Sequence, residues 1–356
     1  MRQVLLHVVM QSLIFSSILL VSANAATNTH FEAIYQFGDS LSDTGNFVRE
    51  PTGGNSAYNK LPYGQTIKHP TGRASDGLLI VDYIAMYFHL PQLNPYLATG
   101  SDFTHGVNFA VIGATANGGG NSLAKQLGWF KTHLTSTFHN PAAIKERLQK
   151  SLILMGEIGG NDFNGPFNEH KSIQEVTKLV PGVVKAIKDA VEEVIGLGAA
   201  NIVVPGNFPI GCVPIYLVQF ATNDTSKYDE LQCLKDYNDF SKSYNHQLLQ
   251  AIQQLQQEHP DVAIVYADYY SALTLTIRNA LNLGIEQDGT KKACCGTGNN
   301  PHNFGSQSCG SPGSLVCPDP SKRVNWDGVH MTQQGNKGVA DELIKQFVPT
   351  LQKHNR

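Results

Sequence analysis

The sequence has little charge and no cluster of charge of either sign. Only 15% of its 356 residues are Asp, Glu, Lys or Arg, and 26 basic residues stand against 29 acidic ones, a net charge of −3. Proteins that bind nucleic acid or an anionic membrane surface concentrate Lys and Arg in runs or patches. This chain has no such run, so we expect no nucleic acid and no membrane surface among its partners.

The sequence signatures of several common architectures and sites are also missing. The chain has no collagen period, no heptad run and no repeat of about 20–50 residues, which excludes fibrous and solenoid folds. It lacks the Walker A, G-x-G-x-x-G, H-E-x-x-H and G-x-S-x-G motifs, and it has no C-x-x-C pair. We therefore predict no metal and no cofactor. A hydrophobic content of 41% excludes a disordered chain.

A long apolar run occurs only at the start of the chain. Arg2 precedes an apolar stretch from Leu5 to Val21 that several polar residues interrupt, and Ala23-Asn24-Ala25 then provides a small-x-small cleavage site. This pattern predicts a secretory signal peptide over residues 1–25. A transmembrane anchor is disfavoured by the interruptions and by the cleavage site. We expect a soluble mature protein in the extracellular space (apoplast) or, as the alternative, in the vacuole.

All six cysteines lie in the second half of the chain, and secretion would place them in an oxidising compartment. An even number there predicts disulfides, with 15 pairings open. Cys212 and Cys233 flank a loop that they could close, and the other four lie in the Gly- and Pro-rich stretch 284–323, which we interpret as a stapled loop. Asn223 heads the only N-x-[ST] sequon and is the predicted glycosylation site.

Strand and helix patterns alternate along the chain. Short β-rich runs occur at 33–37, 107–112, 152–157, 201–205 and 262–267. Helical periodicity occurs at 172–197, 236–258 and 333–351. Nearly continuous apolar strands between helices predict an α/β fold, a three-layer α/β/α sandwich with a central parallel sheet of about five strands. No break in composition divides residues 26–356, so we expect a single domain with long loops near 49–75 and 284–323.

In such a fold, ligands bind beyond the carboxyl ends of the strands, and the residues found there suit hydrolysis by a serine. Ser40 follows the first strand at a turn that would expose its hydroxyl. Asp327 and His330 are three residues apart, close enough for the carboxylate to orient the imidazole as a base. Gly113 offers an unshielded N–H and Asn161 a side-chain NH₂, the donors that an oxyanion needs.

Each of these pieces is common by itself. Gly-Asp-Ser is a frequent turn tripeptide, Gly113 could serve only a tight turn, and Asn161 with Asp162 could be a helix cap. Their conjunction, in a consistent order and at strand ends, favours catalysis. We interpret Asp39, Asp43 and Asn46 as residues that brace the turn around Ser40.

The four pieces together resemble the four sequence blocks of the GDSL/SGNH hydrolase family, and the resemblance covers nearly the whole chain. They are Gly38-Asp39-Ser40 with Asp43-Thr44-Gly45-Asn46, the glycine Gly113, Gly159-Gly160-Asn161-Asp162, and Asp327-Gly328-Val329-His330. The fold implied by the resemblance is flavodoxin-like. Other segments, such as Leu61-Pro62-Tyr63-Gly64, look like the plant secreted branch, nearest in motifs to sinapine esterase and acetylajmalan esterase.

The resemblance implies catalytic roles for Ser40 as nucleophile, His330 as general base and Asp327 as its orienter. It further implies an oxyanion hole made by the Ser40 and Gly113 N–H groups and the Asn161 side chain. The expected activity is that of a secreted, monomeric serine carboxylesterase that acts on a small or aromatic acyl ester of a plant specialised metabolite. The alternatives are an acyltransferase of the same fold and, less favoured, a lipase or a non-catalytic wall- or carbohydrate-binding relative.

Overall fold

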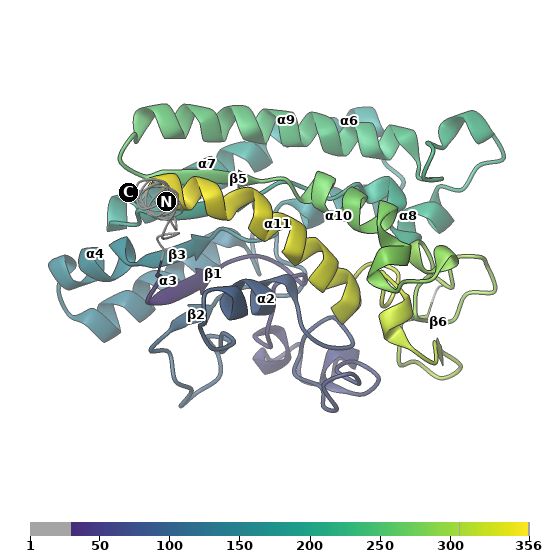
Figure 1. Ribbon diagram of the computed structural model, residues 1–356, viewed down its shortest axis with the longest axis horizontal. Coiled ribbons are helices and arrows are strands. Elements are labelled where there is room, and N and C mark those ends of the chain that lie inside the picture. Colours follow the sequence, from purple (N-terminus) through teal and green to yellow (C-terminus); the bar gives the residue numbers. More distant parts are fainter. Residues whose placement is uncertain (1–29, 306, 355–356) are drawn as a thin grey trace, which may run out of the picture.

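A five-stranded parallel sheet lies at the centre of the computed structural model, which describes residues 30–305 and 307–354 (Figure 1). The strand order is β2-β1-β3-β4-β5, and every neighbouring pair is parallel. The strands are β1 (Ala33–Gln36), β2 (Gly106–Asn108), β3 (Ser151–Leu154), β4 (Asn201–Pro205) and β5 (Ala263–Ala267). This confirms the predicted sheet, and the predicted signal peptide lies outside the described residues.

In β1, β3, β4 and β5, alternate residues enter two different hydrophobic cores. In β3, Ile153 packs into one core while Leu152 and Leu154 pack into the other. A strand buried on both faces has no polar side, which explains why these strands read as continuous apolar runs rather than as an alternating pattern.

Helices cover both faces of the sheet, so the predicted three-layer sandwich is confirmed. One face carries α3 (Leu123–Phe138), α4 (Pro141–Gln149), α5 (Gly160–Asn168), α6 (Ile173–Thr177), α7 (Val180–Leu197), α8 (Pro214–Gln219) and α9 (Lys235–Glu258). The opposite face carries α2 (Ile80–Tyr87), α10 (Tyr269–Arg278) and α11 (Gln333–His354). In Figure 1, α11 crosses the molecule in yellow and α9 runs along the other side.

The predicted helix over 172–197 is in fact two helices. The chain leaves helical structure after α6 and re-enters it at Val180, with Pro181 in the first turn of α7. A proline inside a continuous helix would remove one backbone hydrogen bond and clash with the carbonyl four residues earlier. The first helical turn tolerates proline because its N–H groups have no partner there. The helices predicted at 236–258 and 333–351 correspond to α9 and α11.

The two long loops contain short ordered elements. Residues 49–75 include the 3-10 helix η2 (Ala57–Asn59) and follow η1 (Phe47–Arg49). Residues 284–323 hold the antiparallel pair β6 (Cys295–Gly296) and β7 (Leu315–Val316), with the 3-10 helices η6 (Gln287–Thr290) and η7 (Pro320–Lys322). The remaining 3-10 helices are η3 (Ile210–Cys212), η4 (Thr225–Lys227) and η5 (Ala280–Leu283).

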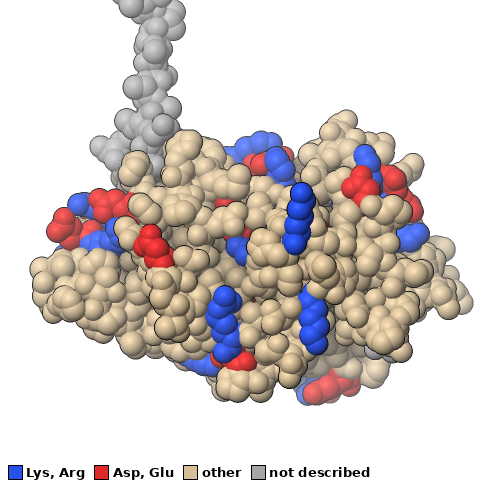
Figure 2. All heavy atoms as spheres, turned by 90° about the horizontal axis from the view of Figure 1, so that it is seen from below, with Lys and Arg blue, Asp and Glu red and all other residues tan. Residues whose placement is uncertain are grey.

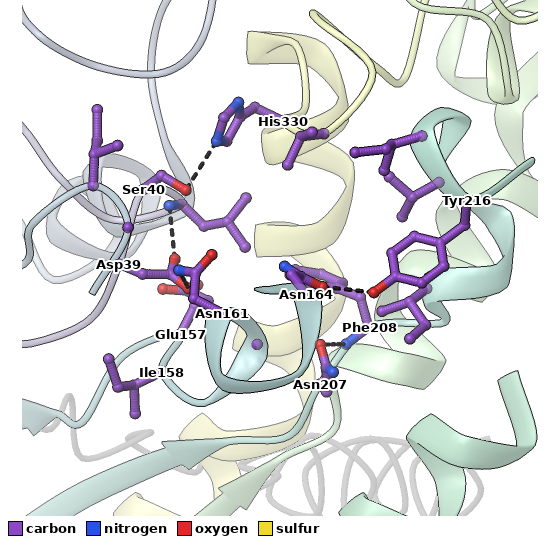
Figure 3. Close-up of a pocket in the computed structure, with 18 of the residues that line it drawn as sticks. Asp39, Ser40, Glu157, Ile158, Asn161, Asn164, Asn207, Phe208, Tyr216 and His330 are labelled. Carbon is purple, nitrogen blue, oxygen red and sulfur yellow. Dashed lines mark hydrogen bonds between the residues drawn. The ribbon is translucent and has the colours of Figure 1, made fainter. Parts of the chain in front are cut away.

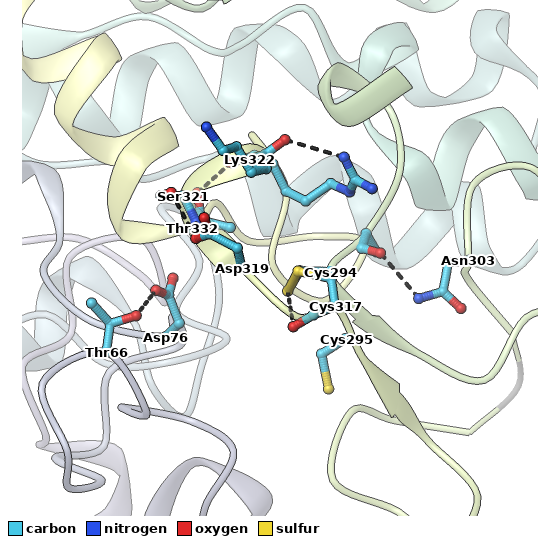
Figure 4. Close-up of a disulfide and its surroundings, with 12 residues drawn as sticks. Thr66, Asp76, Cys294, Cys295, Asn303, Cys317, Asp319, Ser321, Lys322 and Thr332 are labelled. Atoms are coloured by element: carbon cyan, nitrogen blue, oxygen red, sulfur yellow. Dashed lines mark hydrogen bonds between the residues drawn. A yellow bond between two sulfur atoms is a disulfide. The ribbon is translucent and has the colours of Figure 1, made fainter. Parts of the chain in front are cut away.

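All six cysteines form disulfides. Cys212 bonds to Cys233, as the flanking positions suggested. The other two bridges, Cys294–Cys317 (Figure 4) and Cys295–Cys309, cross the second long loop. The stretch 284–323 is therefore stapled twice, as expected, and the pairing that the sequence left open is settled by the fold.

The surface agrees with the sparse charge of the sequence. On the face in Figure 2, basic and acidic side chains are scattered among uncharged ones and form no broad patch of one sign. No helix within the described residues is long and apolar enough to cross a membrane.

Candidate active site

Ser40, Gly113 and Asn161 meet at one edge of the sheet, because each follows the carboxyl end of a parallel strand. They line a cavity of about 330 Å³ together with His330, which arrives from the loop before α11 (Figure 3). The structure thus brings together four of the five predicted site residues in the cavity itself, and the fifth, Asp327, lies directly behind His330.

Ser40, His330 and Asp327 form a continuous hydrogen-bonded chain. His330 Nε2 lies 2.8 Å from Ser40 Oγ, and His330 Nδ1 lies 2.8 Å from Asp327 Oδ2. The other carboxylate oxygen, Oδ1, accepts the backbone N–H groups of His330 at 2.9 Å and Val329 at 3.1 Å. The tight turn that starts at Asp327 therefore fixes the carboxylate against the imidazole of the same turn.

The Asp327–His330 pair is buried, and each residue changes the pKa of the other. Burial alone would lower the pKa of His330, but the charge and the hydrogen bond of Asp327 raise it above its ordinary value of 6.5. Burial works to raise the pKa of Asp327, yet the charge and hydrogen bond of His330 hold it below its ordinary value of 3.8. The carboxylate is thus ionised and stabilises a protonated imidazole.

Two backbone donors face the cavity unpaired. Within the described part of the chain, neither the Ser40 N–H nor the Gly113 N–H has a protein acceptor. Gly113 adopts a φ of +78°, and a Cβ atom there would touch nothing within 4 Å. A glycine is therefore favoured here by the left-handed backbone conformation and not by lack of space.

Asn161 is in place, but its amide is already engaged. Its Nδ2 donates to Asp39 Oδ2 at 3.1 Å (Figure 3) and to the Ala114 carbonyl at 3.0 Å. An oxyanion can therefore receive this donor only by sharing or replacing one of those two bonds. The sequence pattern predicted the presence of the amide and not its two partners.

Asp39, Asp43 and Asn46 make the bracing contacts expected around Ser40. Asp39 Oδ1 accepts the Leu41 N–H at 3.0 Å. Asp43 accepts four backbone N–H groups, three from residues 45–47 and one from Ile112 after β2. Asn46 donates to the carbonyls of Asn108 and Ala110. The turn after β1 is thereby tied to the segment that carries Gly113.

Asp39 also has an electrostatic role that the sequence did not suggest. Burial raises its pKa to about 8, against the backbone hydrogen bond from Leu41 that lowers it. Burial likewise raises the pKa of Glu157, which lies beside it. Burial thus disfavours ionisation of Asp39, whose full negative charge would oppose an oxyanion next to Ser40.

Two further side chains, Gln126 and Asp162, hold the loops at the edge of the cavity through hydrogen bonds to their backbone. Gln126 of α3 pairs with Gly38 in both directions: the Gly38 N–H donates to Oε1 at 2.9 Å, and Nε2 donates to the Gly38 carbonyl at 2.7 Å. Asp162 accepts the N–H groups of Ala116 and Asn117 at 2.7 and 2.9 Å, and so orders the loop after Gly113. It supports a neighbouring loop rather than capping its own helix.

The cavity walls are mostly apolar and neutral. Their apolar side chains are Leu41, Tyr58, Ile112, Ile158, Phe208, Ile210, Val213, Ile215, Tyr216 and Val329. Asn164 and Asn207 add neutral amides, and Asn164 Oδ1 accepts the Tyr216 hydroxyl at 2.6 Å. Of the aromatic residues that adjoin the motifs, Phe208 lines the cavity, whereas Phe109, Phe163 and Trp326 are fully buried in the cores.

No three His, Cys, Asp or Glu residues gather as metal ligands within residues 30–305 and 307–354. The predicted glycosylation site, Asn223, is exposed just before η4.

Comparison with known proteins gives the same family. A family model described as GDSL-like lipase/acylhydrolase matches residues 34–343. The chain is 42% identical to acetylajmalan esterase 2 of Rauvolfia serpentina, over 95% of this chain and 97% of that protein. It is 41% identical to a GDSL esterase/lipase of Arabidopsis thaliana, over 95% of this chain and 91% of that protein.

Among solved structures, an acetyl-xylooligosaccharide esterase from Geobacillus matches with a TM-score of 0.42 and 11% identity, over 89% of this chain and 94% of that chain. The family match spans most of the chain, and the curated relatives align along nearly their full length. The chain therefore belongs to the GDSL-like lipase/acylhydrolase family and is a carboxylic ester hydrolase.

Proposed function

We propose that the protein cleaves carboxylic esters through an acyl-enzyme on Ser40. His330 is the general base, and Asp327 orients His330 and stabilises its protonated form. The observation that carries this proposal is the hydrogen-bonded chain from Ser40 Oγ through both nitrogens of His330 to Asp327, at the wall of a mostly apolar cavity. A nucleophile, a base within hydrogen-bonding reach and a group that orients the base are the parts that acyl transfer requires.

In the first half of the reaction Ser40 Oγ forms a bond to the ester carbonyl carbon while its proton passes to His330 Nε2. The carbonyl electron pair moves onto oxygen, and the tetrahedral species then expels the alcohol, which takes the proton from His330. In the second half water loses a proton to His330 and attacks the acyl-enzyme. Ser40 leaves, recovers that proton, and the carboxylic acid departs.

Three donors would stabilise the oxyanion in both halves. The Ser40 and Gly113 N–H groups, which have no acceptor within the described residues, are free to bind it directly. Asn161 would contribute by shifting one of its amide hydrogens from Asp39 or Ala114. Each donor of this kind is worth about 3 kcal/mol of transition-state stabilisation.

The cavity supports an ester with a small or aromatic acyl group. Its volume of about 330 Å³ lies at the lower end for small-molecule sites. Its neutral amides and aromatic rings suit a compact uncharged group and leave little room for a long lipid chain. The acetylajmalan esterases among the relatives fit the same preference, and a plant specialised metabolite is the substrate class that we favour.

We also propose that the protein is secreted, to the apoplast or the vacuole, as a single domain of residues 26–356. The signal-peptide pattern of residues 1–25 supports this, as do three disulfides and the exposed sequon at Asn223. Disulfides of this number are typical of proteins that pass through an oxidising compartment.

A Ser40→Ala variant tests the mechanism. We expect it to lose ester hydrolysis by at least about a thousandfold while its thermal unfolding stays that of the wild type, because the change removes only a hydroxyl. The assay is a panel of acetyl, hydroxycinnamoyl and long-chain esters, with an added alcohol in one arm to detect acyl transfer. A Ser40→Ala variant with wild-type activity would refute the nucleophile assignment, and a preference for the long-chain ester would refute the substrate class.

A further inference from the structure

The first long loop reaches the catalytic carboxylate through one side chain. Tyr63 donates its hydroxyl to Asp327 Oδ2 at 2.7 Å, although the two residues are 264 positions apart. Oδ2 is also the oxygen nearest to His330 Nδ1, while Oδ1 is held by backbone N–H groups of its own turn. Tyr63 therefore supplies the only side-chain donor, apart from His330, that the described residues direct at this carboxylate.

The tyrosine belongs to a small third core that sits behind Asp327. This core joins Tyr63 to Trp326 and to the half-cystines Cys294, Cys295 and Cys309. The Tyr63 ring meets Trp326 edge-on, with ring centroids 6.0 Å apart, and only 3% of the tyrosine is exposed. A buried hydroxyl without a partner would cost free energy, so its one bond to Asp327 is what makes tyrosine suitable there.

The second long loop holds the same segment from its backbone. Cys294 N–H donates to the Asn325 carbonyl at 2.9 Å, and Cys295 N–H donates to the Trp326 carbonyl at 2.6 Å. Trp326 N–H in turn donates to the His330 carbonyl at 2.7 Å. The two long loops also touch each other, since a Cβ atom on Gly310 would lie 3.3 Å from Pro62 Cδ.

We infer that Tyr63 is a positioning residue for the ester-cleaving reaction: together with the stapled second loop it fixes the carboxylate of Asp327 so that His330 points at Ser40. This inference rests on the proposed triad. Without Tyr63, Oδ2 would be held by His330 alone, and the carboxylate could pivot about Oδ1, which its own turn holds. Such a pivot would let the imidazole leave the line to Ser40 Oγ.

The hydrogen bond from Tyr63 to Asp327 also changes how strongly the negative charge of Asp327 acts on His330. The groups that face the pair are Tyr63, Tyr58 from the same loop and Asp39 from the turn after β1. The Tyr63 hydroxyl spreads the negative charge of Asp327, so removal of this donor strengthens the hold of Asp327 on a protonated imidazole. The pKa of His330 therefore rises further when the hydroxyl is lost.

Tyr63→Phe tests the inference, with Tyr83→Phe as the matched control, because among the described residues the Tyr83 hydroxyl bonds only to the Gln333 carbonyl, at 3.4 Å. In Tyr63→Phe we expect kcat to fall about tenfold with KM little changed, and the acidic limb of the kcat/KM profile to move to higher pH. Thermal unfolding should stay near that of the wild type, because phenylalanine preserves the ring contacts. Tyr83→Phe should leave kcat and the pH profile unchanged.

A wild-type kcat and pH profile in Tyr63→Phe would overturn the positioning role. A loss of kcat that merely follows a loss of thermal stability, with the acidic limb unmoved, would also overturn it. The inactivity of Ser40→Ala reports separately on the triad. An inactive Ser40→Ala beside an unaffected Tyr63→Phe refutes the positioning role alone, whereas an active Ser40→Ala refutes the proposed function on which it rests.

Discussion

The two halves of the site are held in different ways. The sheet-end half, Ser40, Gly113 and Asn161, comes directly after three neighbouring strands and is braced by buried side chains on adjoining turns. The loop half, Asp327 and His330, precedes α11 and is held by Tyr63, a small core of its own and two disulfides. The comparison shows that a parallel sheet positions only the residues at the ends of its strands, so the Asp327–His330 pair needs a separate support.

The two halves also differ in the kind of interaction that holds them in place. Asp43 and Asn46 hold the sheet-end half through hydrogen bonds to backbone groups, which depend on a narrow set of backbone angles. The loop half depends on ring packing and covalent bridges, which hold a segment that contains little regular secondary structure. The sheet-end half should therefore be most sensitive to backbone substitutions, and the loop half to the loss of its cross-links.

Among variants that leave the catalytic side chains in place, Gly38→Ala should cause the largest loss. Gly38 has a φ of +136°, and an added Cβ would lie 3.0 Å from Ser42 Oγ and 3.1 Å from the backbone N and O of Glu157. We expect strain of roughly 1–3 kcal/mol and a displaced Ser40 that lowers kcat/KM by about a hundredfold. Gly100→Ala is the control, because Gly100 also has a positive φ and its Cβ would meet nothing within 4 Å. Equal activity in the two variants would contradict the rigid turn.

Removal of single disulfides should have a smaller effect and should show which bridge supports the loop half. The Cys294→Ser/Cys317→Ser double variant should lower kcat roughly tenfold, because that bridge supports the segment before Asp327. Cys212→Ser/Cys233→Ser is the matched variant and should mainly raise KM, because its bridge ends at η3, which lines the cavity.

Each double variant should also lose about 3 kcal/mol of stability, since the bridges span similar lengths of chain. Steady-state kinetics and urea unfolding measure these quantities. The distinction between the halves fails if both variants change the same kinetic parameter by the same factor.

The smallest effect we predict is on the pH profile, whose two limbs should report on different halves. As the proposed general base, His330 would act only when neutral, and its raised pKa predicts that activity falls as the pH drops through a value above 6.5. Activity should also decline above about pH 8, where Asp39 ionises beside the oxyanion donors. In Asp39→Asn the alkaline decline should disappear and the acidic limb should remain. A profile of kcat/KM for both proteins tests this, and an unchanged alkaline limb would remove Asp39 from the explanation.

Several parts of the structure could be predicted from the sequence because they depend on neighbours in the chain. Apolar runs predicted the parallel sheet, and the spacing of Asp327 and His330 predicted a pair that meets within one turn. The position of Cys212 and Cys233 around one loop suggested the bond that they form. The single helix predicted over 172–197 failed because apolar periodicity continued through Pro181, and the local preference of proline outweighed that periodicity.

By itself, therefore, the sequence determined the layered fold, the residues that meet at the strand ends and the family. Only the tertiary structure decided the pairing of the four cysteines in the second loop, the engagement of the Asn161 amide by Asp39 and Ala114, and the bond from Tyr63 to Asp327. The physical reason is distance along the chain. Periodicity, turn preference and capping act over a few residues, whereas these contacts join segments that approach only when the whole sheet and both long loops have packed.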